Sequence, residues 1–535
     1  MRRHVLIAAA ALLLSCPAIL AQGGGELRFC LQAEPKTFNP LLVNDDASAT
    51  VRYLTGGVLL RVNRLTQQPQ AELATSWKVL DGGKSIRFKL RSGIHYSDGT
   101  PFSAEDVAFT MQHLMDPALH STTADAFRSA EGKTITRVTS PESIEITFPA
   151  PVANLANLFD TVAIISSKSP QKEMAALGPF YVAEHKAGSY ILLKRNPNYW
   201  KKDSAGHQLP YLDSIRLEIE PNRDIEALKY ERGEIQLINT LSAPLFEKLS
   251  AANAALVRDA GPSTDTEQLW FNQVSSAPIA AYKKAWFVST NFRRAISEAI
   301  NRDDLARLVY RGHAHAAVGI VPTSNTFWFN SSLKPHPYDP ADALKKLKQD
   351  GFKFENGQLR DKSGNAVEFS IVTNAGNRSR ESMAAMIQQD LKKVGIKVNL
   401  VPLDFNSLLE RITQSYNYEA CLLGNVNGDL DPSSVMTMWL SSGEDHIWNP
   451  KQKTPATLWE AEIDQEMRTQ ASTPDQNKRK AAWDKVQKIE WEQEPLIYLV
   501  NKDSLVAIAP TVKNAQPSAF GPQTYWNVEE LALAH

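Results

Sequence analysis

The loop at 424–432 carries a dense set of polar side chains that could bind a charged ligand. It reads Gly-Asn-Val-Asn-Gly-Asp-Leu-Asp-Pro and follows a predominantly apolar segment at 418–423 that is predicted to be a strand. Its two acids and two amides are Asp429, Asp431, Asn425 and Asn427. A carboxylate just past a strand end could pair with a ligand's ammonium group, because a buried charge without a partner costs several kcal/mol. The alternative, that the aspartates only form turns with their own backbone, stays open for Asp429 and is favoured for Asp431.

Four further residues could line a ligand site, three of them aromatic. They are Trp270, Asn272, Trp439 and Tyr498. Aromatic side chains form apolar walls that tolerate ligands with variable side chains. Large aromatics are also the residues most often buried for packing, so a place in the core is the favoured alternative for each.

His313 and His315 could bind a metal ion, since alternate residues of a strand point to the same face. The neighbouring sequence offers no third ligand, so we predict hydrogen-bonded or exposed histidines and no metal site or cofactor. The sequence has no P-loop, no Gly-x-Ser-x-Gly elbow and no His-Glu-x-x-His. We therefore predict that the protein is not an enzyme.

The N-terminus is typical of an export signal. A basic start at 1–4 precedes an apolar run at 5–14, which is too short for a membrane-spanning helix of about 20 residues. We predict a signal peptide over residues 1–21 and a periplasmic protein. Attachment of a lipid to Cys16 is the alternative, and in either case the chain is exported.

Length, charge and cysteine content exclude several classes of protein. The 535 residues are enough for two or three domains. With 58 basic and 59 acidic residues the net charge is −1, which argues against a nucleic-acid partner. Cys30 and Cys421 remain after the leader, and two buried thiols are favoured over a disulfide.

The clearest fold signal is a strand–helix–strand pattern in the second half of the chain. A strand at 367–372 precedes an amphipathic helix at 383–394, which Gly395 ends, and a second strand follows at 396–400. Short connections of this kind predict parallel strands with a right-handed crossover, and hence an α/β domain. Two charged amphipathic helices are expected at about 458–470 and 475–493.

Two segments earlier in the chain have a recognisable pattern. Residues 178–200, GPFYVAEHKAGSYILLKRNPNYW, predict a hairpin ending in a Pro-fixed aromatic corner. The segment from Glu72 to Phe109 predicts a hairpin followed by a helix, with Ser103 and Asp106 placed as a capping box. Together with LPYLDSIRL at 209–217 and NFRRAISEAINR at 291–302, these segments resemble, in the same chain order, the family 5 extracellular solute-binding proteins of ABC importers.

This resemblance implies a two-lobed α/β fold of the periplasmic-binding-protein type II (cluster C), with an inserted subdomain in the first lobe. The first lobe would take residues 23–265 plus 490–535, with the insertion at about 50–170, and the second lobe residues 266–489. Trp270 and Tyr498 would lie near the crossings between lobes.

The resemblance also implies a function. The protein would capture an oligopeptide in the inter-lobe cleft, close by hinge motion and deliver it to ABC permease subunits, as a monomer. In peptide-binding relatives a carboxylate in the acidic loop takes the ligand's amino terminus; here the matching place falls on Gly428, with Asp429 one residue closer to Pro432. Nickel or a metallophore, haem or an oligosaccharide are alternative cargoes, and a cell-envelope scaffold is an alternative role.

Overall fold

A single mixed sheet runs the length of the molecule and joins its two lobes. The computed structural model describes residues 24–534 except 126, 128–131, 153 and 427–430. In spatial order the strands of this sheet are β17 (Lys397–Leu403), β16 (Glu368–Asn374), β18 (Ala420–Val426), β12 (Val257–Phe271), β19 (Leu496–Ile508), β11 (Leu237–Ile238), β1 (Glu26–Leu31), β10 (Ser214–Ile219), β9 (Tyr190–Arg195) and β8 (Phe180–Lys186), with β13 (Ala314–Ala316) on β19.

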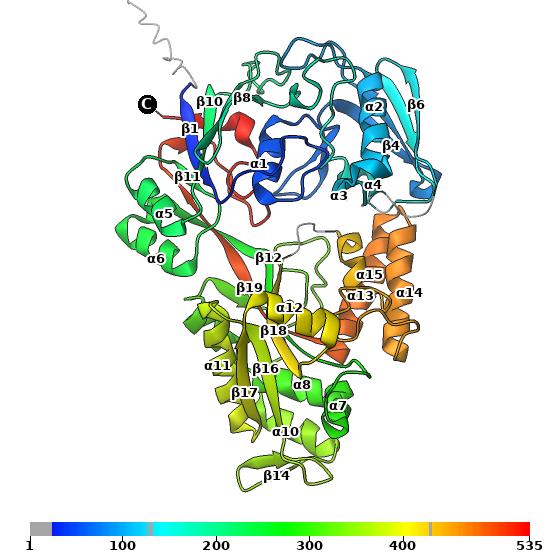
Figure 1. Ribbon diagram of the computed structural model, residues 1–535, viewed down its shortest axis with the longest axis vertical. Helices are drawn as coiled ribbons and strands as arrows, with labels where there is room; N and C mark the ends of the chain where they lie inside the picture. Colours follow the sequence, from blue (N-terminus) through cyan, green and yellow to red (C-terminus); the bar gives the residue numbers. More distant parts are fainter. Residues whose placement is uncertain (1–23, 126, 128–131, 153, 427–430, 535) are drawn as a thin grey trace, which may run out of the picture.

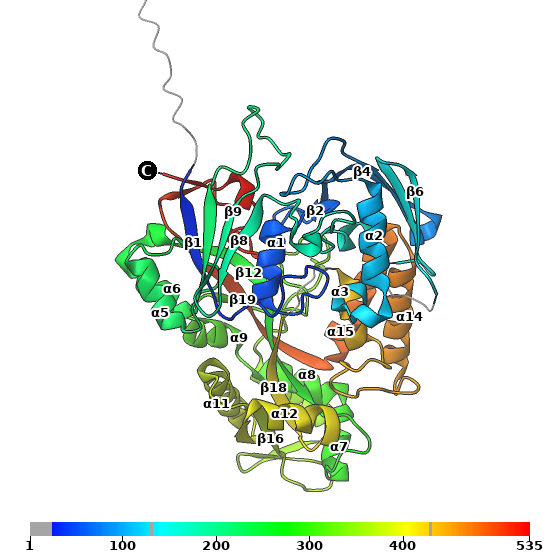
Figure 2. The ribbon, with the colours of Figure 1, turned by 45° about the horizontal axis from the view of Figure 1, so that its top comes forward.

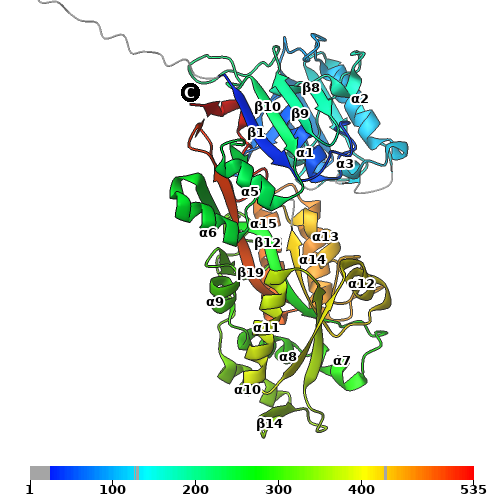
Figure 3. The same ribbon diagram turned by 60° about the vertical axis from the view of Figure 1, so that its left-hand side comes forward.

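The two long central strands, β12 and β19, form the connection between the lobes (Figures 1 and 3). They pair antiparallel from Val257↔Ala507 to Trp270↔Leu496, with register shifts around Pro262. One end of this ribbon pairs with β11 in the first lobe, and the other end pairs with β18 in the second. We refer to this ribbon as the hinge strands.

The first lobe contains a separate antiparallel sheet of order β4–β5–β7–β6. Its strands are β4 (Ala74–Leu80), β5 (Ser85–Leu90), β7 (Ser143–Thr147) and β6 (Ile135–Ser140). Short pairs elsewhere are β2 (Leu60–Val62) with β3 (Pro69–Ala71), β14 (Lys353–Glu355) with β15 (Gln358–Arg360), and β20 (Val512–Lys513) with β21 (Ala532–Leu533).

Helices surround the sheet in both lobes (Figure 2). In the first lobe they are α1 (Asp46–Thr55), α2 (Ala104–Met115), α3 (Thr122–Asp125), α4 (Leu155–Leu158), α5 (Arg223–Glu231) and α6 (Ala243–Ala252). In the second lobe they are α7 (Ala281–Val288), α8 (Thr290–Ala299), α9 (Arg302–Asp304), α10 (Pro340–Gln349), α11 (Arg378–Lys393), α12 (Phe405–Glu410), α13 (Met436–Trp439), α14 (Leu458–Ser472) and α15 (Gln476–Gln493). None of the described helices is long and apolar enough to cross a bilayer.

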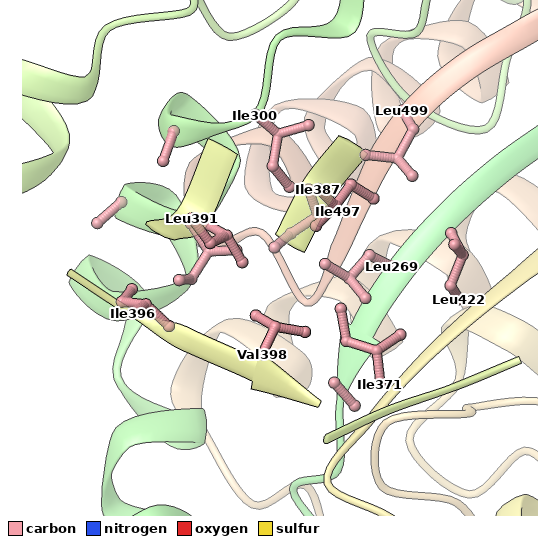
Figure 4. Close-up of a cluster of buried hydrophobic side chains, with 14 of the residues drawn as sticks. Leu269, Ile300, Ile371, Ile387, Leu391, Ile396, Val398, Leu422, Ile497 and Leu499 are labelled. Carbon is pink, nitrogen blue, oxygen red and sulfur yellow. The ribbon is translucent and has the colours of Figure 1, made fainter. Parts of the chain in front are cut away.

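The predicted strand–helix–strand unit is confirmed. β16 and β17 are parallel, with Glu368 opposite Lys397, and α11 connects them. The apolar face of α11 packs with the sheet in the core of the second lobe, where Ile371, Ile387 and Leu391 are fully buried (Figure 4). Gly395 follows the end of α11, before β17, with φ of +77°, a conformation that glycine adopts without steric cost.

The other local predictions also agree with the structure. The hairpin at 178–200 is β8 and β9, and the expected C-terminal helices are α14 and α15. Ser103 and Asp106 form the capping box of α2. Cys30 and Cys421 are free and buried, as expected for packing thiols. The predicted signal peptide at 1–21 and Cys16 lie outside the described residues, and the domain limits at 265/266 and 489/490 stay predictions.

Candidate functional site

The acidic loop begins at the end of β18, beside the hinge strands. β18 pairs with β12 along its whole length, from Phe271↔Ala420 to Asp265↔Val426. On its other side, β16 pairs only with Ala420 and Cys421. From Leu423 onward, β18 therefore continues along β12 beyond the last described pair with β16.

Asp431 fixes the far end of the loop. Its Oδ1 accepts a hydrogen bond of 2.9 Å from the backbone N–H of Ser433, so Asp431 caps the short helical turn η7 (Pro432–Val435). The guanidinium of Arg479 in α15 forms a bidentate ion pair with the same carboxylate. Nη1 donates to Oδ2 at 2.9 Å and Nη2 donates to Oδ1 at 2.5 Å. Both side chains are nearly inaccessible to solvent. Asp431 is therefore a loop anchor as well as a turn former.

The loop residues predicted to bind ligand are only partly described. Asn427 and Asp429 lie outside the described residues. Asn425 is in β18, half-buried and in register with Thr266 of β12. Of the two residues that flank 427–430, Val426 pairs with Asp265 in the sheet and Asp431 pairs with Arg479.

The other four predicted site residues are buried in the second lobe. Trp270, Trp439 and Tyr498 belong to one hydrophobic cluster, and Trp439 packs against Trp448 and Trp483. Burial, with a smaller effect of the nearby Glu490 carboxylate, raises the pKa of Tyr498 well above its usual value.

Hydrogen bonds account for the polar atoms of two of these residues. Nε1 of Trp270 donates to the hydroxyl of Tyr418 at 3.1 Å. Nδ2 of Asn272 donates to the carbonyl oxygens of Tyr416 and Tyr418 at 2.8 and 2.9 Å. These contacts support the packing alternative, and ligand contact by any of the four stays a prediction.

A charge cluster beside the loop was not foreseen from the sequence. Glu267 of β12 is 2 % exposed and accepts from Nε of Arg380 at 2.7 Å and from its Nη2 at 3.3 Å. Lys502 of β19 places Nζ 3.4 Å from Asp265 and 3.6 Å from Glu267. We call Asp265, Glu267, Arg380 and Lys502 the arginine cluster; its formal charges, two acidic and two basic, cancel.

Gly424 leaves the space that this cluster needs. A Cβ on Gly424 would lie 2.3 Å from Nη2 of Arg380 and 3.0 Å from the Glu267 carboxylate oxygens. The guanidinium therefore packs directly over the backbone of β18 at the start of the acidic loop. Arg380 also donates through Nη1 to Oδ1 of Asn374 at 2.9 Å, which connects the end of β16 to the same cluster.

Comparison with known proteins gives a consistent result. Residues 68–446 match the model of the bacterial extracellular solute-binding proteins, family 5. The chain is 27 % identical to a probable ABC transporter-binding protein of Deinococcus radiodurans, covering 96 % of this chain and 93 % of that protein. It is 23 % identical to the oligopeptide-binding protein AppA of Bacillus subtilis, covering 96 % and 92 %.

Solved structures share the fold. The substrate-binding protein CtaP of Listeria monocytogenes has a TM-score of 0.78 at 21 % identity, covering 96 % of this chain and 100 % of that one. NikA of Brucella suis, in complex with Fe(III)-EDTA, has a TM-score of 0.77 at 21 % identity, covering 95 % and 100 %. AppA of Bacillus subtilis in complex with a nonapeptide has a TM-score of 0.66 at 21 % identity, covering 96 % and 100 %. From its motifs, its two-lobed sheet and these matches, the chain belongs to family 5 of the bacterial extracellular solute-binding proteins.

Proposed function

We propose that this protein captures oligopeptides between its lobes, outside the cytoplasm, and delivers them as a monomer to the permease of an ABC importer. Hinge strands that join two lobes allow closure on a ligand, which shifts the population toward the closed form by the contacts it makes to both. The protein would act by binding alone, with ATP hydrolysed by other subunits.

The observation that carries the proposal is the course of β18. Its Leu423 and Gly424 lie beyond the β16 pairs and precede the acidic loop, whose described residue Asp431 is paired with Arg479. Extended peptides bind by adding a strand to an available sheet edge, where backbone groups provide affinity whatever the peptide's side chains are. A peptide bound along the end of β18 could pair its ammonium group with a carboxylate of the acidic loop that follows.

The names of several relatives support a peptide as the cargo. Other relatives point to the alternative cargoes that have to be tested. AppA carries the name oligopeptide-binding protein, and a relative in Pseudomonas aeruginosa is named a dipeptide-binding protein. NikA and a glutathione-binding protein share the fold or the family. Peptide, glutathione and metal-chelate ligands therefore belong in the same binding screen.

Calorimetry with a peptide set tests the proposal. We expect free-amino peptides to bind and N-acetylated ones to bind much more weakly. Bound peptide should stabilise the protein by about 2.7 kcal/mol at a hundredfold excess over Kd. Binding of Ni²⁺ chelates or oligosaccharides without binding of any peptide would instead assign a different cargo.

Two aspartates of the loop separate ligand binding from loop anchoring. Asp429→Ala should weaken binding of free-amino peptides by about 3–5 kcal/mol and leave the free energy of unfolding unchanged, because it removes the ligand's counter-charge. Asp431→Ala is the matched comparison. It should lower the free energy of unfolding by about 3–5 kcal/mol, because Arg479 keeps a buried charge without its partner. Unchanged peptide affinity in Asp429→Ala would remove that residue from the site.

A further inference from the structure

A second group of charged side chains lies where the hinge strands leave the first lobe. Asp259 and Asp503 come from β12 and β19, His313 and His315 from the segment at β13, and Glu247 from α6. We call these five residues the histidine cluster. Glu247 in α6 of the first lobe contacts His313, which precedes β13 of the second lobe, so the cluster joins elements of both lobes.

The charges of this cluster are not matched. It holds three carboxylates, and in the described residues none of them forms an ion pair with lysine or arginine. Its cationic partners are the two histidines, which carry charge only when protonated. Such an excess of negative charge in a half-buried place attracts a cation.

Three of the side chains already point their ligand atoms at one another. Asp259, His313 and Asp503 each offer one possible ligand atom, and these three atoms lie within 4.8 Å of one another. Ligand atoms bound to zinc at about 2.1 Å in tetrahedral geometry are about 3.4 Å apart. Rotation of the two carboxylates would bring the three ligand atoms to that separation. The third ligand that the histidine pair lacks in the local sequence thus comes from the hinge strands.

One oxygen of the buried Asp503 carboxylate, Oδ1, is without a hydrogen bond in the described residues. The Asp503 side chain is 3 % exposed, and Nε2 of His315 is 3.1 Å from this oxygen. An unbonded carboxylate oxygen buried to this degree is costly unless a cation is bound. His315 and Asp259 are exposed, so a metal ion can enter from solvent.

His313 is oriented as a metal ligand usually is. Its Nε2 lies 2.8 Å from Oε1 of Glu247, and its Nδ1 lies 3.1 Å from Oδ2 of Asp259. Metal-binding histidines commonly donate one ring N–H to a carboxylate, which fixes the tautomer and directs the other nitrogen to the metal. Glu247 fills that role here as a positioning residue, with Nδ1 as the ligand atom. The ring of Phe246 packs on His313 at 4.5 Å and holds it in place.

From this geometry we propose that Asp259, His313 and Asp503 bind one divalent transition metal ion of the zinc class at the hinge strands. One imidazole and two carboxylates are suitable ligands for Zn²⁺ and leave a position for water or His315. None of its residues belongs to the acidic loop, so the site does not depend on the cargo proposed above.

Zinc titration of the purified, EDTA-treated protein tests this site. We expect one Zn²⁺ per chain, measured by calorimetry and by metal analysis after dialysis. His313→Asn and Asp259→Asn should each weaken binding by at least about tenfold, and Glu247→Gln by about tenfold. Co²⁺ should give the visible absorption of a tetrahedral site in the native protein, and His313→Asn should abolish it.

A surface histidine–aspartate pair supplies the control. His207 lies 2.9 Å from Asp203 and is exposed, so His207→Asn removes a comparable pair far from the hinge strands. It should leave zinc binding unchanged. Equal zinc binding in native protein and His313→Asn, no zinc binding by the native protein, or preference for Ca²⁺ over Zn²⁺ would each overturn the site. Asp259 is exposed, so Asp259→Asn keeps the test valid if a variant at the buried Asp503 fails to fold.

Discussion

The arginine cluster and the histidine cluster lie on the same two strands and differ in how their charge is balanced. Lys502 and Asp503 are neighbours in β19, and consecutive strand residues point to opposite faces. Lys502 pairs with Asp265 and Glu267, and Arg380 pairs with Glu267, so the two acidic and two basic charges cancel. Asp503 joins Asp259 and two histidines, where acids are in excess.

This difference in charge balance distinguishes an ion cluster that only stabilises the fold from a site that could bind a cation. A matched, hydrogen-bonded cluster needs nothing more and is costly to break, since losing one partner leaves a buried charge. An unmatched one gains from a cation or a proton. Variants in the two clusters should therefore change stability in opposite directions.

The largest effect is expected from Arg380→Met. It leaves Glu267, 2 % exposed, without its main partner, and should lower the free energy of unfolding by about 3–5 kcal/mol in chemical denaturation. Arg28→Met is the control, because Arg28 pairs with Glu26 at the surface, where such pairs contribute only about 0–1 kcal/mol. Similar losses in both variants would show that the arginine cluster is no more structural than a surface pair.

A smaller effect is expected from Gly424→Ala. The new methyl group would meet Arg380 at 2.3 Å and force the guanidinium off Glu267, at a cost of about 1–3 kcal/mol. Gly319→Ala is matched to it, since its Cβ would only make an ordinary contact of 3.5 Å with Glu490. We expect Gly319→Ala to be neutral or slightly stabilising in the same thermal-unfolding measurement. A neutral Gly424→Ala would contradict the tight fit.

The smallest effect has the opposite sign. Asp503 has a folded-state pKa raised to about 6, so the stability it contributes is present at low pH and is lost as pH rises through about 6. Asp503→Asn removes that loss. In metal-free protein it should be more stable than native by about 1 kcal/mol at pH 8 and equal to it near pH 4. A variant less stable than native at pH 8 would show that the Asp503 charge is matched after all.

Local patterns in the sequence were sufficient for individual elements and for one strand–helix–strand unit, whereas the two-lobed fold came from the resemblance to the family. The period of the apolar residues in α11, the turn at Gly395 and the capping box of Ser103 are each decided within a few residues. The order of the matching segments added the family, because it reflects the whole chain. Charge clusters of the hinge strands are different: Glu267 meets Arg380 across 113 positions, and no local pattern indicates that contact.

The candidate site shows the same division. Asp431 could be predicted as a turn former from its place before Pro432, yet its pairing with Arg479 depends on how α15 packs on the loop. His313 and His315 were recognised as a pair, whereas Asp259 and Asp503 join them only through strand pairing. For Trp270 and Trp439, residue type alone could not decide between a position in the hydrophobic core and one lining the ligand cleft. In the structure both are buried in a hydrophobic cluster.

Small-angle scattering with and without a bound free-amino peptide tests capture between the lobes most directly. We predict a smaller radius of gyration at saturating peptide, as the lobes approach each other about the hinge strands, and a curve unchanged by the N-acetylated peptide. Superimposable curves with a peptide that calorimetry shows to be bound would contradict closure, and the absence of binding by every peptide would contradict the proposed cargo.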